Sequence, residues 1–201
     1  MTEHTDNKNT APLQHYGRIF ADSDPEALSA RCGIPYENDQ FRIRFFNRDF
    51  SLSWPEMELK DANGIAGSPS LKILLVRLLL EGTLIPSSGR FLPYREFPGG
   101  EVYITQFTGR CIRRLAGKYG NALPAFTAAF NRLGGRLIPG GDASCELDFL
   151  PELKIRLTIW EGDEEFPPNA QILFSDNFQT AFSAEDLAVV GDLLINALSK
   201  Q

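Results

Sequence analysis

The amino-acid sequence predicts an α+β fold in a single domain, with a mainly antiparallel sheet and helices packed against it. Segments in which apolar and polar residues alternate, as in half-buried strands, occur in runs along the chain, and so do segments with helical spacing. A doubly wound parallel sheet would need strands that alternate with helices, and that order is absent. With 201 residues, 43% of them hydrophobic, the chain can bury a substantial core.

The N-terminal part begins with a polar segment, residues 1–10, for which we predict a disordered tail, so that the domain spans residues 11–201. Apolar spacing over residues 12–21 predicts a first helix. A second helix should begin after Asp24, because aspartate caps helix N-termini and the proline that follows fits the first helical position. It should end at Gly33.

A β-hairpin, a buried helix and a long loop come next. Residues 41–45 and 50–54 both alternate, and the polar residues between them suit a turn. The helix that starts after Ser68 and ends at Gly82 is apolar nearly all round, so it should lie in the core. Residues 83–101 contain three prolines and three glycines but also large apolar side chains, which predicts an ordered loop packed on the domain.

The second half of the chain should hold most of the strands. We expect a short strand over 102–107, helices over 109–120 and 124–133, strands over 144–149, 154–160 and 170–174, and a final helix that begins at Ser183. Alternation in the strand 154–160 places Ile155, Leu157 and Ile159 on one face and Lys154, Arg156, Thr158 and Trp160 on the other.

Charge and hydropathy argue against several classes of protein. The formal net charge is −6, whereas proteins that bind a phosphate backbone usually carry a basic patch, so we expect no nucleic-acid binding. The densest basic group, Arg110, Arg113, Arg114 and Lys118, fits the solvated face of a helix. We expect no membrane insertion, because no apolar run reaches the ~18–20 residues that span a bilayer. The polar N-terminus lacks a secretory signal, which favours a cytoplasmic protein.

Cysteine and histidine usage constrains the chemistry. The three widely spaced cysteines, Cys32, Cys111 and Cys145, suit reduced thiols and form no iron–sulfur or zinc motif, so no metal site is assigned and any cofactor stays unknown. The only histidines are His4 and His15, so a Ser/His/Asp or Cys/His pair would have to recruit His15. Whether the protein is an enzyme is left open; if it is, carboxylates, arginines or a bound cofactor do the chemistry.

The densest group of titratable residues lies in the turn after the strand 154–160. Glu161, Asp163, Glu164 and Glu165 lie within five residues and precede Phe166-Pro167-Pro168. We expect the bounding aromatic residues to pin this turn to the core. Three uses fit its carboxylates: holding a hard cation, acid–base catalysis with mutually raised pKa values, and pairing with Arg95. The alternative is a solvated turn. Trp160 would either stack on a flat ligand or pack against the final helix.

A second candidate segment lies in the long loop, where Gly99-Gly100 permits close approach of a ligand to the backbone. We expect Tyr94–Gly100 and Trp160–Pro167 to meet in space and form one site. The ligand-binding candidates are Tyr94, Arg95, Glu96, Gly99, Gly100, Trp160, Asp163, Glu164 and Glu165.

The order and spacing of several motifs resemble those of an uncharacterised family. The motifs are the leucine-rich helix near residues 73–80, Gly89–Gly100 with Tyr103 and Phe107, Leu133-Gly134-Gly135, and Ile159–Pro167. Together they resemble the domain of unknown function 3786 family, over residues 15–198. The resemblance implies an anaerobic bacterial or archaeal setting, and no reaction. Some members carry a cysteine-rich iron–sulfur segment, which this chain lacks.

Three functions follow as hypotheses. The first is a cytoplasmic binding or accessory protein for anaerobic redox or cofactor metabolism, with a corrinoid or iron–sulfur protein as its partner. The second is a carboxylate-dependent enzyme that acts on a small anionic substrate oriented by Arg95. The third is a structural protein-interaction module that docks through the face formed by Arg110, Arg113 and Arg114. The oligomeric state is left open.

Overall fold

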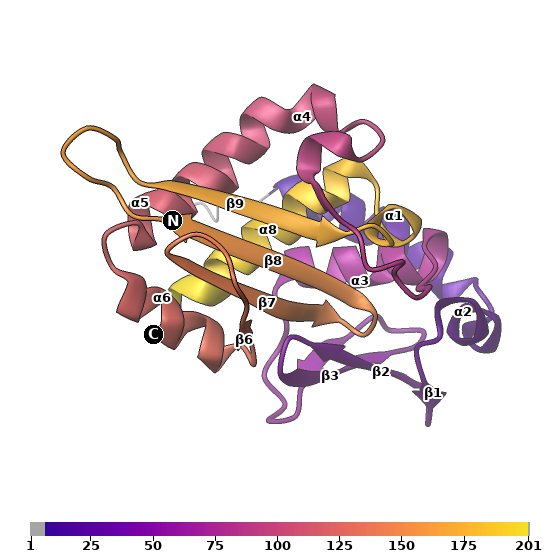
Figure 1. Ribbon diagram of the computed structural model, residues 1–201. Helices are drawn as coiled ribbons and strands as arrows, with labels where there is room; N and C mark the ends of the chain where they lie inside the picture. Colours follow the sequence, from indigo (N-terminus) through magenta and orange to yellow (C-terminus); the bar gives the residue numbers. More distant parts are fainter. Residues whose placement is uncertain (1–6, 201) are drawn as a thin grey trace, which may run out of the picture. The chain divides into compact units, whose positions relative to one another are not determined.

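The computed structural model describes residues 7–200 and confirms the α+β class with antiparallel sheets and packed helices (Figure 1). Residues 1–6 of the expected tail lie outside the described residues, and the first helix begins at Asn7, inside the segment expected to be disordered. The chain forms two compact units. The first comprises the residues up to Arg44 with Arg48–Thr83, and the second comprises Phe45–Asn47 with the residues from Leu84 onward. The domain boundaries 11–201 stay a prediction.

The first unit combines three helices with an antiparallel sheet. Its elements are α1 (Asn7–Ala21), α2 (Pro25–Cys32), β1 (Tyr36–Glu37), β2 (Gln40–Phe45), β3 (Arg48–Ser53), β4 (Leu59–Asp61) and α3 (Pro69–Glu81), and the strand order is β1-β2-β3-β4. The predicted cap at Asp24 is confirmed, because its side chain accepts hydrogen bonds from the backbone N–H groups of Glu26 and Ala27. Ser68, after which the buried helix was expected to start, likewise accepts the backbone N–H of Leu71. The buried side chains of α3 confirm it as a core helix.

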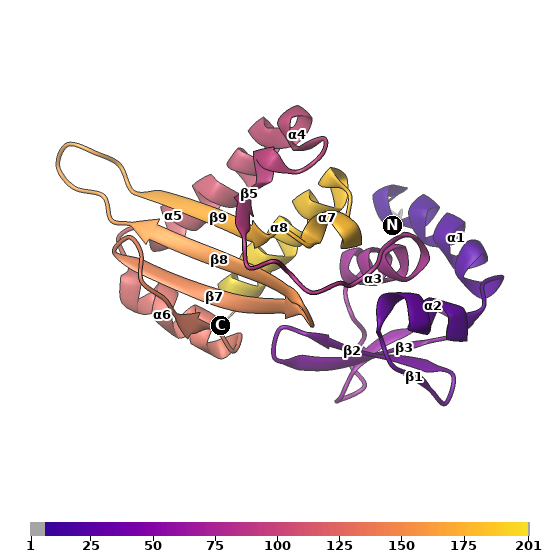
Figure 2. The ribbon, with the colours of Figure 1, turned by 45° about the vertical axis from the view of Figure 1, so that its right-hand side comes forward.

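The second unit contains a five-stranded antiparallel sheet (Figure 2). Its elements are β5 (Phe91–Pro93), the 3₁₀ turn η1 (Tyr94–Glu96), α4 (Gly100–Phe107), the π-helical turn η2 (Thr108–Ile112), α5 (Arg113–Tyr119), α6 (Leu123–Arg132), β6 (Arg136–Leu137), β7 (Ala143–Leu150), β8 (Leu153–Trp160), β9 (Asn169–Ser175), α7 (Phe178–Ala181) and α8 (Ala184–Ser199). The strand order is β5-β9-β8-β7-β6, and all neighbouring strands are antiparallel.

The prediction of a strand over residues 102–107 is wrong, because this segment is helix α4. It continues through η2 into α5, so that residues 100–119 form one helical run. The buried side chains Phe107, Cys111, Leu115 and Tyr119 recur every four residues along this run. Burial of that helical face overrides the β-prone sequence of the first turns.

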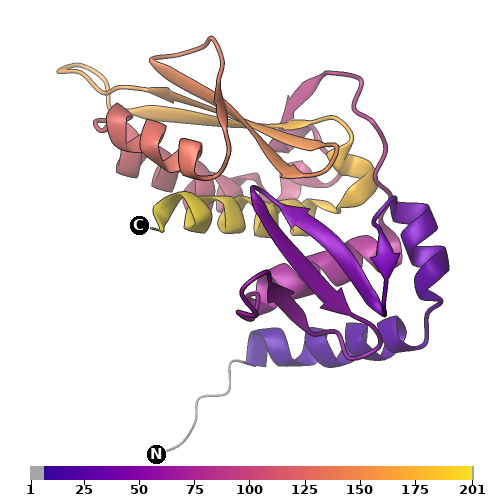
Figure 3. The same ribbon diagram turned by 90° about the horizontal axis from the view of Figure 1, so that it is seen from below.

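The five-stranded sheet has a core face and an outer face. The helices α4, α5, α6 and α8 lie on one side of the sheet (Figure 3). The predicted alternation in β8 is confirmed: Leu153, Ile155, Leu157 and Ile159 are buried, and the residues between them are less buried. We call the side that carries Lys154, Arg156, Thr158 and Trp160 the outer face.

The C-terminal end of α8 receives hydrogen bonds from neighbouring helices. Tyr119 Oη donates to Leu198 O over 2.7 Å, and Arg132 Nη2 donates to the same oxygen over 2.9 Å. Lys118 Nζ lies 3.3 Å from Ser199 O. Because α8 has no basic residue in its last turn, Arg132 and Lys118 supply the positive charge that stabilises a helix C-terminus.

Candidate functional site

The hairpin between β8 and β9 ends in a tip, Glu161–Pro168, whose backbone is held by its own hydrogen bonds. Asp163 Oδ1 accepts the backbone N–H groups of Glu165 over 2.8 Å and Phe166 over 2.7 Å. The Asp163 N–H donates to Phe166 O over 2.9 Å. The hydrogen bonds from Phe166 and Glu165 lower the pKa of Asp163. For this carboxyl, the pKa shift is therefore opposite to the rise expected from repulsion between like charges.

The base of the tip is attached to the end of α5. Gly162 N–H donates to Gly120 O over 3.3 Å. Pro168 lies so close to Gly120 that a Cβ atom there would approach Pro168 Cβ to 2.1 Å, so only glycine permits this contact. On the other side, Glu161 N–H donates to Asp142 Oδ2 over 2.8 Å.

The expected anchoring of the tip by its bounding aromatic residues is wrong. Phe166 is 67% exposed and Trp160 is 37% exposed. Trp160 is out of phase with the buried residues of β8 and is exposed, so the alternative in which it packs against the final helix is also wrong. Backbone hydrogen bonds and Pro168 hold the tip instead, which leaves two aromatic side chains accessible at one end of the sheet.

The ligand-binding candidates in the long loop fall into two groups, buried residues that stabilise the fold and exposed residues. Tyr94 is buried and stacks on Phe107 with 4.1 Å between ring centroids, and its hydroxyl donates to Ala184 O over 2.8 Å. Burial raises the pKa of Tyr94 to about 12, so the phenol stays protonated. A Cβ atom at Gly100 would lie 2.2 Å from Tyr94 O, so this glycine permits the tight turn into α4. Arg95, Glu96 and Gly99 are exposed.

The expected meeting of Tyr94–Gly100 with Trp160–Pro167 is wrong. The loop precedes the first residue of the helical run 100–119, whereas the tip contacts Gly120 just beyond its last residue. At 1.5 Å per residue, this run separates the two segments by about 30 Å. Figures 1 and 2 show them at opposite ends of α4–α5. Arg95 therefore cannot pair with the carboxylates of the tip or orient a substrate toward them.

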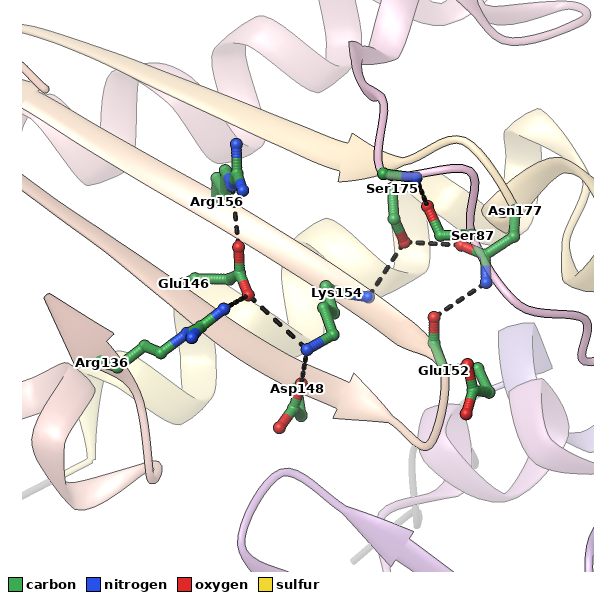
Figure 4. A network of polar contacts seen from close by, with 10 residues as sticks. Ser87, Arg136, Glu146, Asp148, Glu152, Lys154, Arg156, Ser175 and Asn177 are labelled. Carbon is green, nitrogen blue, oxygen red and sulfur yellow. Dashed lines mark hydrogen bonds and ion pairs between the residues drawn. The ribbon is translucent and has the colours of Figure 1, made fainter. Parts of the chain in front are cut away.

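A charged cluster on the outer face was not predicted from the sequence (Figure 4). Its members are Arg136 on β6, Glu146 and Asp148 on β7, and Lys154 and Arg156 on β8; we call it the Glu146 cluster. The Glu146 side chain is only 3% exposed. Arg136 Nη2 lies 2.5 Å from Glu146 Oε1, and Arg156 Nε donates to Glu146 Oε2 over 2.8 Å. Lys154 Nζ lies 3.7 Å from Glu146 Oε1 and 3.4 Å from Asp148 Oδ1.

The ionised form of Glu146 is stabilised by its partners. Burial by itself raises the pKa of this carboxyl, but the hydrogen bonds and charges of Arg136 and Arg156 outweigh burial and hold the pKa below its usual value. The carboxylate therefore stabilises the fold at pH values above its unfolded-state pKa of about 4.3. That stabilisation is lost as the pH falls through the lower folded-state pKa.

Replacing Glu146→Gln should lower the free energy of unfolding by about 1–3 kcal/mol at pH 7 and by much less at pH 3. Urea unfolding of both proteins at the two pH values measures this difference. Glu164→Gln on the exposed tip is the matched control and should have little effect at either pH. An equal loss of stability at both pH values for Glu146→Gln would contradict the assignment.

The basic helix face is engaged with α8 over part of its length. Arg110 forms an ion pair with Asp192, and Arg114 Nη2 donates to Asn196 Oδ1 over 3.1 Å. Lys118 reaches the last turn of the same helix. These contacts fasten the helical run to α8, and Arg113 is exposed beside them.

The three thiols are poorly suited to nucleophilic chemistry. All three cysteines are buried. Burial raises the pKa of Cys111 to about 11 and that of Cys145 to about 12, and it also raises the pKa of Cys32. Thiolates are therefore scarce at neutral pH. His15 is exposed on α1, and His4 lies outside the described residues.

Residues 7–200 contain neither a candidate metal cluster nor a candidate membrane-spanning helix. In this part of the chain, His, Cys, Asp and Glu side chains form no group of three or more that could hold a metal ion. Within the same residues, none of the helices has both the length and the apolar character that a membrane crossing requires.

These features define an α+β protein with a pre-formed hairpin tip that exposes aromatic and acidic side chains, and a charged cluster on the open face of its second sheet. The chain belongs to the family described as Domain of unknown function (DUF3786), whose model matches residues 24–197. No curated protein and no solved structure matches the chain. The family membership predicted from the motifs is thus confirmed, and the anaerobic setting stays a prediction.

Proposed function

We propose that this protein is a binding or accessory protein that docks on a partner protein through the hairpin tip. The observation that carries the proposal is the exposure of Phe166, at 67%, on a loop whose backbone is already fixed. Exposing a large aromatic side chain to water is unfavourable, and its burial in a partner would be favourable. Because the loop is already ordered, binding would cost little conformational entropy.

The charges of the tip indicate the chemistry of the partner surface. Glu161, Asp163, Glu164 and Glu165 are all exposed around Phe166. An aromatic anchor surrounded by charges is typical of interface hot spots, in which the ring supplies affinity and the charges supply specificity and association rate. The complementary surface is an apolar pocket with a basic rim.

The partner that we propose is a redox or corrinoid protein, including iron–sulfur proteins, in the cytoplasm of an anaerobe. Support comes from the anaerobic setting that the family resemblance implies. The separation of Arg95 from the carboxylates also favours binding over the alternative of a carboxylate-dependent enzyme, because the two parts of that active site lie at opposite ends of the helical run.

A photo-crosslinking amino acid at position 166 should capture one partner in anaerobically grown cells of the source organism. The matched control carries the same amino acid at Val102, which is 71% exposed on α4, far from the tip. The proposal expects a discrete adduct at position 166 that is absent at position 102, and a corrinoid or iron–sulfur cofactor in the captured protein. The same adducts at both positions would contradict it.

With the captured partner purified, Phe166→Ala should weaken binding by at least about tenfold, because an aromatic anchor at an interface contributes more than about 1.4 kcal/mol. Val102→Ala should leave the affinity unchanged. Isothermal titration calorimetry measures both variants. Equal affinities of wild type and Phe166→Ala would remove the tip as the contact.

A further inference from the structure

The Glu146 cluster lies outside the hairpin tip and carries more positive than negative charge. Three cations, Arg136, Lys154 and Arg156, surround two carboxylates, Glu146 and Asp148. Its only buried member is Glu146, and the side chains of the three cations are 39–68% exposed. The cluster therefore carries one more positive than negative charge.

Arg156 is held in place by two contacts that leave its terminal nitrogens unused. Its Nε donates to Glu146 Oε2, and its guanidinium lies over the ring of Phe91, with Cζ 3.7 Å from the ring centroid. The contact with the ring fixes the plane of the guanidinium, and the contact with the buried carboxylate fixes its direction. Among the described residues, none accepts a hydrogen bond from Nη1 or Nη2 of Arg156.

A fixed guanidinium with free terminal N–H groups is the arrangement that recognises oxyanions. The two terminal nitrogens form a fork that matches two oxygens of a carboxylate or phosphate group. Lys154 and Arg136 approach Glu146 from neighbouring strands and add positive charge beside this fork (Figure 4). Glu146 and Phe91 already hold the long Arg156 side chain in place, so an anion that binds has little further to order. At other surface arginines, the entropy cost of that ordering weakens anion binding.

We propose that Arg156 is the anion-binding residue of a site on the outer face that takes the phosphate or carboxylate group of a small molecule. Glu146 and Phe91 position the guanidinium, and Arg136 and Lys154 supply attraction. This site is separate from the tip in its residues and in its ligand chemistry. A test of this anion site is therefore independent of a test of partner binding at the tip.

Titration calorimetry of the full chain with inorganic phosphate, pyrophosphate and succinate tests the site, at an ionic strength held constant with sodium chloride. Saturable binding of at least one anion with a Kd below about 1 mM is expected. A preference for pyrophosphate or phosphate assigns a phosphate ligand, and a preference for succinate assigns a carboxylate ligand. Absence of saturable binding by all three anions up to about 10 mM overturns the proposal.

Arg156→Lys keeps the positive charge and removes the fork, so it should weaken binding at least about tenfold. Arg113→Lys, the same change at an exposed arginine of α5, is the matched control and should have no effect. An equal loss in both variants would show diffuse charge attraction and overturn the site.

Phe91→Leu provides a second route if Arg156→Lys fails to fold, because it removes only the ring beside the guanidinium. It should weaken binding by about threefold or more. Unchanged binding would overturn the positioning role of Phe91. Phe166→Ala, on the tip, should bind the anion as the wild type does.

Discussion

Phe174→Ala should lower the free energy of unfolding of the second unit by about 3–5 kcal/mol, the largest effect that we expect for a single substitution in this chain. Phe174 is fully buried on β9. Its ring centroid lies 6.0 Å from those of Phe97 and Phe107 and 5.1 Å from that of Phe178. The side chain thus joins the segment before α4, α4 itself and α7 to the sheet, and its removal leaves a cavity that rigid rings cannot fill.

Urea unfolding followed by far-UV circular dichroism measures this change. Val102→Ala is the control, since its side chain is 71% exposed, and its effect should stay within about 0.5 kcal/mol. A loss below about 1 kcal/mol for Phe174→Ala would contradict the assignment of this aromatic cluster as the core of the unit.

Asn177→Ala should lower the free energy of unfolding by about 2–4 kcal/mol, because it leaves buried polar groups without partners. The side chain is 3% exposed, and its amide nitrogen donates to Ile85 O over 2.6 Å and to Glu152 O over 2.8 Å. Its oxygen accepts a hydrogen bond from Ser175 Oγ over 2.6 Å (Figure 4). One side chain thereby joins the loop before β5, the β7–β8 turn and the end of β9.

Thermal and urea unfolding of Asn177→Ala should be compared with those of Asn169→Ala, which removes an exposed amide at the other end of β9. Asn177→Asp separates the contributions, since it keeps an acceptor for Ser175 and loses the donor to both carbonyls. Equal stability of Asn177→Asp and the wild type would show that the two carbonyls do not depend on this donor.

Features set by neighbouring residues could be predicted from the sequence. The alternation in β8, the cap at Asp24 and the start of a helix after Ser68 were all predicted and are confirmed. The final helix was expected to begin at Ser183, and Ser183 and Asp186 form a reciprocal capping box at the start of α8. Each depends on backbone geometry within a few residues, which local sequence specifies.

Features that depend on strand register could not be predicted in the same way. The long loop was placed beside the acidic turn, but β5 pairs with the end of β9 that lies away from the tip, as in the pair Phe91–Ser175. That register joins residues 80 or more positions apart in the sequence, and no local pattern encodes it. The prediction of a short strand over 102–107 was wrong for a related reason. Burial of the segment's side chains in the folded unit decides between helix and strand.

The Glu146 cluster did leave a signal in the sequence. Strands were predicted over residues 144–149 and 154–160, and the first carries Glu146 and Asp148 two positions apart while the second carries Lys154 and Arg156 two positions apart. The observed register, which includes an irregularity between Asp148 and Leu150, places Glu146 opposite Arg156 and Asp148 opposite Lys154. Opposite charges in consecutive cross-strand pairs indicate an ion-pair ladder, a pattern that inspection of each strand alone does not reveal.

The placement of the two tryptophans gives each compact unit its own fluorescent reporter. Trp54 belongs to the first unit, where its indole N–H donates to Phe20 O over 3.0 Å, and Trp160 belongs to the second. Emission from a Trp54→Phe variant therefore follows the second unit, and emission from Trp160→Phe follows the first. Coincident denaturation curves would identify one cooperative folding domain, whereas separate midpoints would identify two units that unfold independently.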